Sequence, residues 1–263
     1  MANEENFKLA IIYQGLDFQR EPLPVAQVDA DLSYFIDHYS EEQTFYLYDK
    51  PIVIWSGTWR FSPEEVESVV LGKREHILIL ASERNVEGYR RLADLVDGNA
   101  YNWSSVNPDT FPGYLEKLTA MSEAIHASGG LWIAPVAPGF DARLVGGTTT
   151  VDRKDGKTLQ IQFNTAIQSS PDAIGLISWN EFSENSHIEP SENYEDRYLK
   201  VLSDIQDVPA PVVRNFDSSE PDNQVGPNPT MGAFGSDKLL ALGAIGFLIV
   251  VSFFVILRRM FHP

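Results

Sequence analysis

Two glutamates, Glu181 and Glu184, stand three residues apart directly after an apolar, strand-like run that ends in Trp179 and Asn180. Cleavage of a glycosidic bond needs one protonated and one ionised carboxyl group, held roughly 5–10 Å apart. An i, i+3 spacing reaches the short end of that range if the chain turns helically after the strand. Burial and mutual repulsion would then separate the two pKa values. We therefore predict a catalytic pair, against the alternative of two solvated glutamates at a helix start.

Aromatic, amide and carboxylate side chains also follow other apolar runs of the sequence. Aromatic rings stack on the C–H faces of sugars, whereas sugar hydroxyls need hydrogen-bond partners, so this set suits a carbohydrate. Core packing is the alternative for any one aromatic residue, and Asp141 could instead join Arg153 and Asp155 in a structural ion network. The predicted substrate-binding residues are Trp55, Tyr101, Asn102, Trp103, Asp141, Trp179 and Asn180.

The elements that would position these residues alternate between strand and helix. Six short runs rich in β-branched and aromatic residues are each followed by a segment with helical periodicity. The predicted strands are residues 9–14, 51–56, 76–82, 99–103, 131–136 and 174–179, and the predicted helices are 25–39, 62–71, 85–96, 110–128, 159–169 and 194–205. Repeated βα units without a Gly-rich nucleotide loop favour an α/β fold of the (β/α)8 TIM-barrel type, with its site at the C-terminal strand ends.

Only six of the eight units of such a barrel are visible in residues 1–206, which we take as the barrel domain. One interpretation places the first two units upstream of Met1, together with the secretion signal that the acidic N-terminal stretch lacks. The alternative is a smaller six-unit sheet in a tail-anchored protein that faces the cytosol.

The C-terminal part of the chain predicts a membrane anchor. Residues 239–257 carry no charge over 19 positions, which at ~1.5 Å per residue spans a bilayer core of ~30 Å as a helix. We predict a transmembrane helix at 238–258, and Arg258 and Arg259 place the tail at 259–263 in the cytoplasm. Residues 207–237, rich in Pro, Gly and Asn, would form a flexible stalk. The expected location is the plasma membrane, single-pass, with an extracellular domain.

The composition limits the partners. A formal net charge of −17 and a pI of about 4.6 would repel a phosphate backbone, so nucleic acid is not expected as a partner. The absence of cysteine excludes disulfides and thiolate metal sites, and the sequence shows no convincing metal-ligand cluster. We therefore expect no metal and no cofactor.

The stretch WNEFSENSHIEPS resembles the closing motif of glycoside hydrolase family 99 and the related family 71, approximately W-N-E/D-x-x-E-x-x-x-I-x-P. A P-G-x-D element ending at Asp141 and an R-x-D-G element beginning at Arg153 are similar to the family 99 segment that precedes the last strand. The resemblance is specific over roughly residues 130–200. The sequence departs from family 99 between and after the glutamates, at Phe182, Ser183 and Asn185, while the pairing of Ser186 with His187 is closer to family 71.

This resemblance implies a (β/α)8 barrel that cleaves internal α-linkages, of α-mannans in family 99 or of α-1,3-glucan in family 71. It also implies that Glu184 is the general acid/base. Glu181 would be the partner carboxylate, which in family 99 is thought to deprotonate the sugar 2-hydroxyl and so produce a 1,2-anhydro intermediate. We therefore expect a membrane-anchored glycoside hydrolase whose partners are an α-linked polysaccharide and the lipid bilayer. The alternative is a catalytically inactive carbohydrate-binding or cell-envelope protein that retains the cleft.

Overall fold

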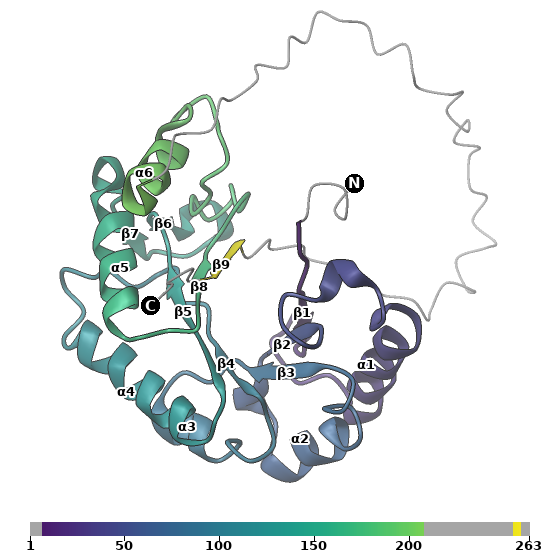
Figure 1. The fold of residues 1–263 in the computed structure, drawn as a ribbon. Helices are drawn as coiled ribbons and strands as arrows, with labels where there is room; N and C mark the ends of the chain where they lie inside the picture. Colours follow the sequence, from purple (N-terminus) through teal and green to yellow (C-terminus); the bar gives the residue numbers. More distant parts are fainter. Residues whose placement is uncertain (1–6, 208–254, 259–263) are drawn as a thin grey trace, which may run out of the picture.

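The computed structural model of the protein describes residues 7–207 and 255–258. Six parallel strands lie side by side in chain order and form a curled sheet (Figure 1). They are β1 (Ile11–Gln14), β2 (Ile52–Ser56), β3 (Leu78–Ala81), β4 (Gly98–Ala100), β5 (Leu131–Val136) and β8 (Ala173–Leu176). The sheet order runs from β1 to β8 and then to β9 (Val255–Arg258), so β1 and β8 do not pair with each other. This arrangement confirms an incomplete barrel.

The helices cover the outer side of the curled sheet (Figure 1). They are α1 (Val25–Tyr39), α2 (Pro63–Val70), α3 (Val86–Arg90), α4 (Tyr114–Ala127), α5 (Lys157–Gln168) and α6 (Arg197–Gln206). Four short 3-10 helices are η1 (Gln43–Phe45), η2 (Thr58–Arg60), η3 (Ala142–Val145) and η4 (Lys154–Gly156). A two-stranded antiparallel sheet, β6 (Phe140–Asp141) with β7 (Thr150–Val151), lies in the connection between β5 and α5.

Local sequence signals set the ends of several helices. Ser62 and Glu65 form a capping box, in which each side chain bonds the other residue's backbone N–H, at 3.2 and 2.8 Å. Helix α4 begins four residues later than predicted because Gly113 adopts a left-handed conformation, with φ 65°, that interrupts the helix after Pro112. Helix α3 ends at Arg90 instead of residue 96, and the chain continues in tighter turns, with Leu92 N–H bonded to the Tyr89 carbonyl.

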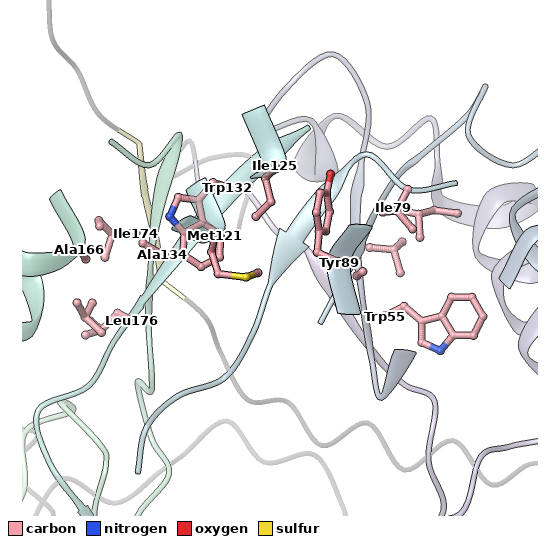
Figure 2. Packing of buried hydrophobic residues seen from close by; sticks show 14 of the residues in the cluster. Trp55, Ile79, Tyr89, Met121, Ile125, Trp132, Ala134, Ala166, Ile174 and Leu176 are labelled. Atoms are coloured by element: carbon pink, nitrogen blue, oxygen red, sulfur yellow. The ribbon is translucent and has the colours of Figure 1, made fainter. Parts of the chain in front are cut away.

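Alternate residues of each strand face two different apolar layers. Val53 and Trp55 of β2 belong to the large core between the sheet and the helices, which also contains Tyr89 and Trp132 (Figure 2). Ile52 and Ile54 of the same strand belong to a second cluster on the opposite, inner face of the sheet. The strands are therefore apolar on both faces, as expected for a parallel sheet covered by helices.

The predicted membrane anchor lies almost wholly outside the described residues, as do nearly all of the predicted stalk and the whole cytoplasmic tail. Within the described residues, no helix has both the length and the apolarity needed to cross a membrane. The described part of the predicted transmembrane helix, Val255–Arg258, is a strand that pairs antiparallel with β8. The anchor as a whole lies outside what the structure describes and stays a prediction.

Candidate active site

The loop after β8 is held in a compact shape by the backbone around Ser178. The N–H of Ser178 donates to the Ser186 carbonyl at 2.9 Å, and its own carbonyl accepts from Ile188 at 3.1 Å. The Ser178 hydroxyl accepts from the N–H of Glu181 at 2.8 Å, and the N–H of Ser186 donates to the Glu181 carbonyl at 3.1 Å. Because both limbs of the loop are tied to Ser178, residues 181–186 form a closed turn at the C-terminal end of β8.

This turn brings Glu181 and Glu184 into electrostatic contact. Both side chains are partly buried, and burial followed by the negative charge of Glu181 raises the pKa of Glu184. The carboxylate of Glu181 accepts a hydrogen bond from the Ser183 hydroxyl. Glu184 is thus biased toward the protonated state beside a second carboxyl group. A carboxyl group with a raised pKa next to a second one is the arrangement that general acid catalysis with an assisting base uses.

Trp179 and Asn180 lie where the loop leaves the sheet. Trp179 is half-buried, packs against the main core, and its carbonyl accepts from the N–H groups of Ile188 and Glu189 at 3.0 and 2.8 Å. Asn180 is exposed, and within the described residues only its backbone carbonyl is engaged, by Phe182 N–H at 3.0 Å. Trp179 therefore holds the loop, while the Asn180 side chain remains available to a ligand.

Asp141 lies next to the carboxylate pair, because its N–H donates to the Glu184 carbonyl at 2.7 Å. Its carboxylate is bound by Arg143, with Nε at 2.9 and 3.1 Å, and these hydrogen bonds lower its pKa to about 2. Asp141 also lines a pocket of about 610 Å³ together with Phe182, Asn185, His187, Tyr194 and others. The predicted sugar contact for Asp141 is thus compatible with its position, in the ionised form.

The alternative ion network of Arg153 with Asp141 and Asp155 is wrong. Asp141 pairs with Arg143, and Asp155 pairs with Arg197. The guanidinium of Arg153 is buried between the rings of Tyr194 and Tyr198, 4.2 and 4.1 Å from their centroids, and it donates to the carbonyl of His187. Arg153 therefore holds the outer limb of the loop against α6 through its ring contacts.

His187 lies beneath the loop and stacks on Phe182, with ring centroids 4.1 Å apart. Burial and the nearby charge of Arg153 lower its pKa to about 4. The imidazole is therefore neutral near neutral pH, and it packs the loop without adding a charge to the carboxylate pair.

A row of aromatic side chains follows the ends of β2 and β4. Trp59, Tyr101, Trp103 and Phe111 are half-buried, and consecutive ring centroids lie 5.7, 5.8 and 5.9 Å apart. We call these four residues the aromatic row. Asn102 lies within it, but its side-chain oxygen accepts from Ser104 N–H at 3.1 Å and so shapes the local turn. The predicted group Tyr101, Asn102 and Trp103 is therefore partly exposed beyond the end of a strand.

Arg20 links the aromatic row to the carboxylate pair. This residue is in the loop after β1, where its N–H bonds the Asp17 carbonyl at 3.0 Å and its φ is 63°. Its positive charge acts on two groups, lowering the pKa of Glu184 and opposing the rise that burial causes in the pKa of Tyr101. The loops after β1, β4 and β8 therefore meet at one side of the sheet, at the C-terminal strand ends.

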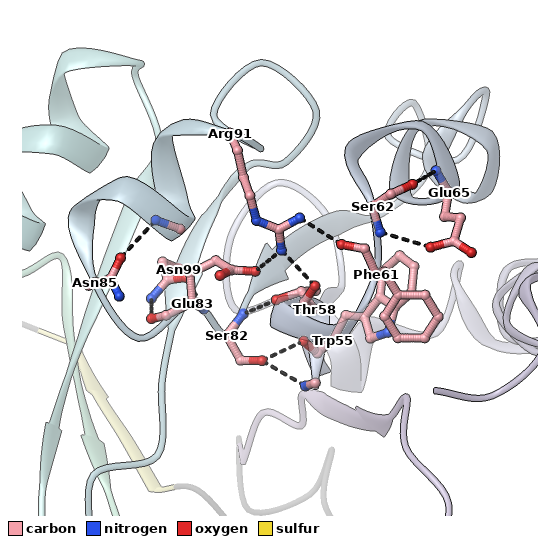
Figure 3. A network of polar contacts seen from close by, with 12 residues as sticks. Trp55, Thr58, Phe61, Ser62, Glu65, Ser82, Glu83, Asn85, Arg91 and Asn99 are labelled. Atoms are coloured by element: carbon pink, nitrogen blue, oxygen red, sulfur yellow. Dashed lines mark hydrogen bonds and ion pairs between the residues drawn. The ribbon is translucent and has the colours of Figure 1, made fainter. Parts of the chain in front are cut away.

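The prediction that Trp55 binds substrate is wrong. Its side chain has no exposed surface and packs against Phe61, with ring centroids 4.9 Å apart (Figure 3). Trp55 has the same strand face as Val53, and that face is directed at the helices. The tryptophan that reaches the site from this strand is Trp59, three residues beyond its end.

Sequence reasoning also missed Arg20, Trp59, Ser178 and Arg84, whose guanidinium lies 4.0 Å from the ring centroid of Trp59. Trp59 could have been found from its place just after a predicted strand, at the edge where barrel sites form. Arg20 and Arg84 carry no such signal, because a cation in a polar loop is usually solvated. Among the residues that the structure describes, no group of three or more His, Asp or Glu side chains could hold a metal ion.

No protein-family model matches the sequence, and no curated protein matches it. Several solved structures share its fold, among them two of a GH99 endo-α-mannosidase. A GH99 endo-α-mannosidase from Bacteroides thetaiotaomicron in complex with bis-tris-propane aligns with a TM-score of 0.62 and 19% identity, over 76% of this chain and 71% of that one. A second structure of the GH99 endo-α-mannosidase from the same organism gives 0.62 and 20%, over 76% and 66%. The chain thus has a fold like that of these GH99 enzymes.

Proposed function

We propose that this protein is a glycoside hydrolase that cleaves internal α-linkages of a polysaccharide, of the α-mannan or α-1,3-glucan type, with Glu184 and Glu181 as the working pair. The observation that carries the proposal is the raised pKa of Glu184 beside Glu181, at the exit of the last parallel strand of a GH99-like sheet. A site at this place and with this asymmetry is what retaining hydrolysis of a sugar linkage needs.

In the proposed first step Glu184 donates its proton to the glycosidic oxygen as the bond to the anomeric carbon breaks. On an α-mannan, whose 2-hydroxyl lies trans to the departing oxygen, Glu181 accepts the proton of this hydroxyl, and its oxygen closes onto the anomeric carbon to give a 1,2-anhydro sugar. In the second step Glu184, now ionised, takes a proton from water, which attacks the anomeric carbon; the bond from this carbon to the 2-oxygen breaks, and Glu181 returns its proton to the 2-oxygen. Both carboxyl groups regain their starting states, and the anomeric configuration is retained. The 2-hydroxyl of an α-glucan lies cis to the departing oxygen, so this route applies to the α-mannan alone.

The remaining side chains of the site have supporting roles in this proposal. Asn180, Asp141 and the aromatic row offer polar atoms and ring edges to the sugar on either side of the cleaved bond. The charge of Arg20 lowers the pKa of Glu184, against the rise that burial and the charge of Glu181 cause. The anchor at residues 239–257, with an extracellular domain and a cytoplasmic C-terminus, belongs to the same proposal and rests on the hydropathy of the sequence.

A second candidate function is carbohydrate binding without turnover. It is favoured by the open sheet, in which the described chain supplies six parallel strands where the complete barrel fold has eight. A cleft with fewer walls would hold a sugar with less exclusion of water, which weakens general acid catalysis.

Release of reducing ends from α-mannan and α-1,3-glucan by the full chain tests the proposal. We expect turnover by the wild type that falls at least about a hundredfold in Glu184→Gln and is unchanged in Glu192→Gln, an exposed glutamate of the same loop. No turnover on either polymer, with oligosaccharide binding equal in the wild type and Glu184→Gln, would refute hydrolysis and leave the binding function.

A further inference from the structure

The aromatic row carries two cations on its rings. The guanidinium of Arg84 lies 4.0 Å from the ring centroid of Trp59 and 5.8 Å from that of Tyr101. The ammonium of Lys117 lies 4.2 Å from the ring centroid of Trp103 and 5.5 Å from that of Phe111. Cations are attracted to the negative faces of aromatic rings, so both side chains are held over the row. They also cover ring faces on which a neutral sugar would stack.

Neither cation has an anionic partner in the part of the chain that the structure describes. Within residues 7–207 and 255–258, the side chains of Arg84 and Lys117 form no ion pair and no hydrogen bond, although the whole chain has a net charge of −17. Two carboxylates close to them in sequence are already engaged, Glu83 by Arg91 and Asp109 by Lys154. The N–H donors of the two cations are therefore free to bind an external anion.

A buried polar network fixes the backbone from which the first cation and its ring project. Arg91 donates to the carbonyls of Thr58 and Phe61 at 2.8 and 2.6 Å, and to the buried carboxylate of Glu83 at 2.7 Å (Figure 3). Thr58 directly precedes Trp59, and Glu83 directly precedes Arg84. The same guanidinium thus sets the spacing of the ring and the cation, which makes this part of the surface preorganised.

Lys117 lies in a partly desolvated position. Burial lowers its pKa, and its residue is half-buried on the first turn of α4. A cation held with reduced hydration pairs more strongly with an anion than a fully solvated one. Arg20 also has no ion pair within the described part of the chain, and its charge acts on Tyr101 and Glu184.

We propose that the aromatic row with Arg84 and Lys117 is a subsite for an acidic substituent of the polysaccharide, a carboxylate or a phosphate. The inference rests on the proposed function, because it places the charged sugar in the cleft that leads to Glu184. Guanidinium and ammonium donors bind the oxygens of either anion, and the rings beneath them restrict the approach to one side. The preferred substrate is then an acidic α-linked polymer, and neutral mannan or glucan is a weaker ligand.

Calorimetric binding to the full chain tests this subsite, in a Glu184→Gln background that prevents hydrolysis. The probes are three α-linked oligosaccharides of equal length, which are neutral, uronate-bearing or phosphorylated. We expect at least one acidic probe to bind about tenfold or more tightly than the neutral one at low salt, and to lose most of that preference at about 0.5 M salt. The acidic probe that binds more tightly shows whether the subsite prefers a carboxylate or a phosphate.

The variants Arg84→Gln and Lys117→Gln should each reduce the preference, and together abolish it, while affinity for the neutral probe stays within about twofold. Arg90→Gln on α3 and Lys157→Gln on α5 remove the same charge away from the row and should leave the preference intact. Equal affinity for neutral and acidic probes, or a preference that survives the double substitution, would overturn the inference. The wild type's hydrolysis of the same probes is scored separately. Turnover without an acidic preference overturns only the subsite, acidic binding without turnover overturns only the hydrolase, and no binding overturns both.

Discussion

Replacement of Arg91 by methionine should destabilise the fold more than any exposed substitution. The Arg91 side chain joins three parts of the chain, since it donates to two carbonyls of the segment after β2 and to the carboxylate of Glu83 after β3 (Figure 3). The side chain of Glu83 is only 3% exposed, so solvent cannot replace the guanidinium. Methionine keeps much of the volume and removes every donor.

The size of the effect follows from these contacts. Removing one partner of a buried ion pair costs about 3–5 kcal/mol, because the other charge is left without compensation. For a domain of this size, each kcal/mol lowers Tm by roughly 2–4 °C, so we expect a loss of about 6–20 °C. The double variant Arg91→Met with Glu83→Gln removes the stranded charge and should recover part of the loss.

Urea unfolding followed by tryptophan fluorescence measures the free energy of unfolding for these variants. Arg90→Met is the matched control, because this neighbouring arginine is exposed and forms no ion pair within the described residues. It should change the free energy by less than about 0.5 kcal/mol. A loss below about 1 kcal/mol for Arg91→Met, or no recovery in the double variant, would refute the assigned role of this network.

Three further predictions concern the pH dependence of the site and the position of one tryptophan. Arg20 lowers the pKa of Glu184, so Arg20→Gln should raise the pKa of this residue. Because the acid works when it is protonated, the alkaline limb of the kcat/KM profile should then move to higher pH. Arg20→Lys keeps the charge and should leave the profile where it is. A shift of this limb to lower pH in Arg20→Gln would contradict the prediction. The pKa of His187 is lowered to about 4, so between about pH 6.5 and pH 4 the unfolded chain binds a proton that the folded chain does not. The free energy of unfolding should therefore fall by up to about 3 kcal/mol over that range in urea titrations, and equal slopes for wild type and His187→Gln would show that His187 is not the cause. Trp55→Phe should cost about 1–3 kcal/mol of stability through lost packing while KM stays unchanged, and a raised KM at unchanged stability would return Trp55 to the site.

Periodicity and position along the chain were enough to predict the fold and the place of the carboxylate pair. The helix predicted at residues 25–39 is α1 with the same bounds, because its apolar positions recur at helical spacing and Pro24 and Ser40 flank it. The glutamates were found because they follow a buried strand in a fold whose sites form at strand ends.

The face of Trp55 could not be read from the sequence. The strand IVIWS is apolar at four consecutive positions, since both faces of the sheet are buried, so no polar alternation tells which residues face the helices. The direction of Trp55 is decided by packing against Phe61 and its neighbours, which only the tertiary structure supplies.

The cations of the site also escaped prediction, for a related reason. Arg84 and Arg20 come from different loops, and the ring or carboxylate that each acts on is distant in sequence, as with Arg20 and Glu184. An ion network of Arg153 with aspartates was one alternative, but its guanidinium lies between the rings of Tyr194, which precedes α6, and Tyr198, which belongs to α6. Contacts of this kind depend on how helices dock, and local patterns do not contain that information.

The dependence of cleavage on leaving-group acidity tests the assignment of Glu184 as the acid most directly. The measurement is kcat/KM of the wild type, Glu184→Gln and Glu181→Gln on an α-linked oligosaccharide and on the matching α-glycosyl fluoride, whose leaving group needs no proton. We predict that Glu184→Gln loses at least about a hundredfold on the oligosaccharide and less than about tenfold on the fluoride, whereas Glu181→Gln loses heavily on both. Equal losses on the two substrates for Glu184→Gln, or full activity of either variant, would contradict the account.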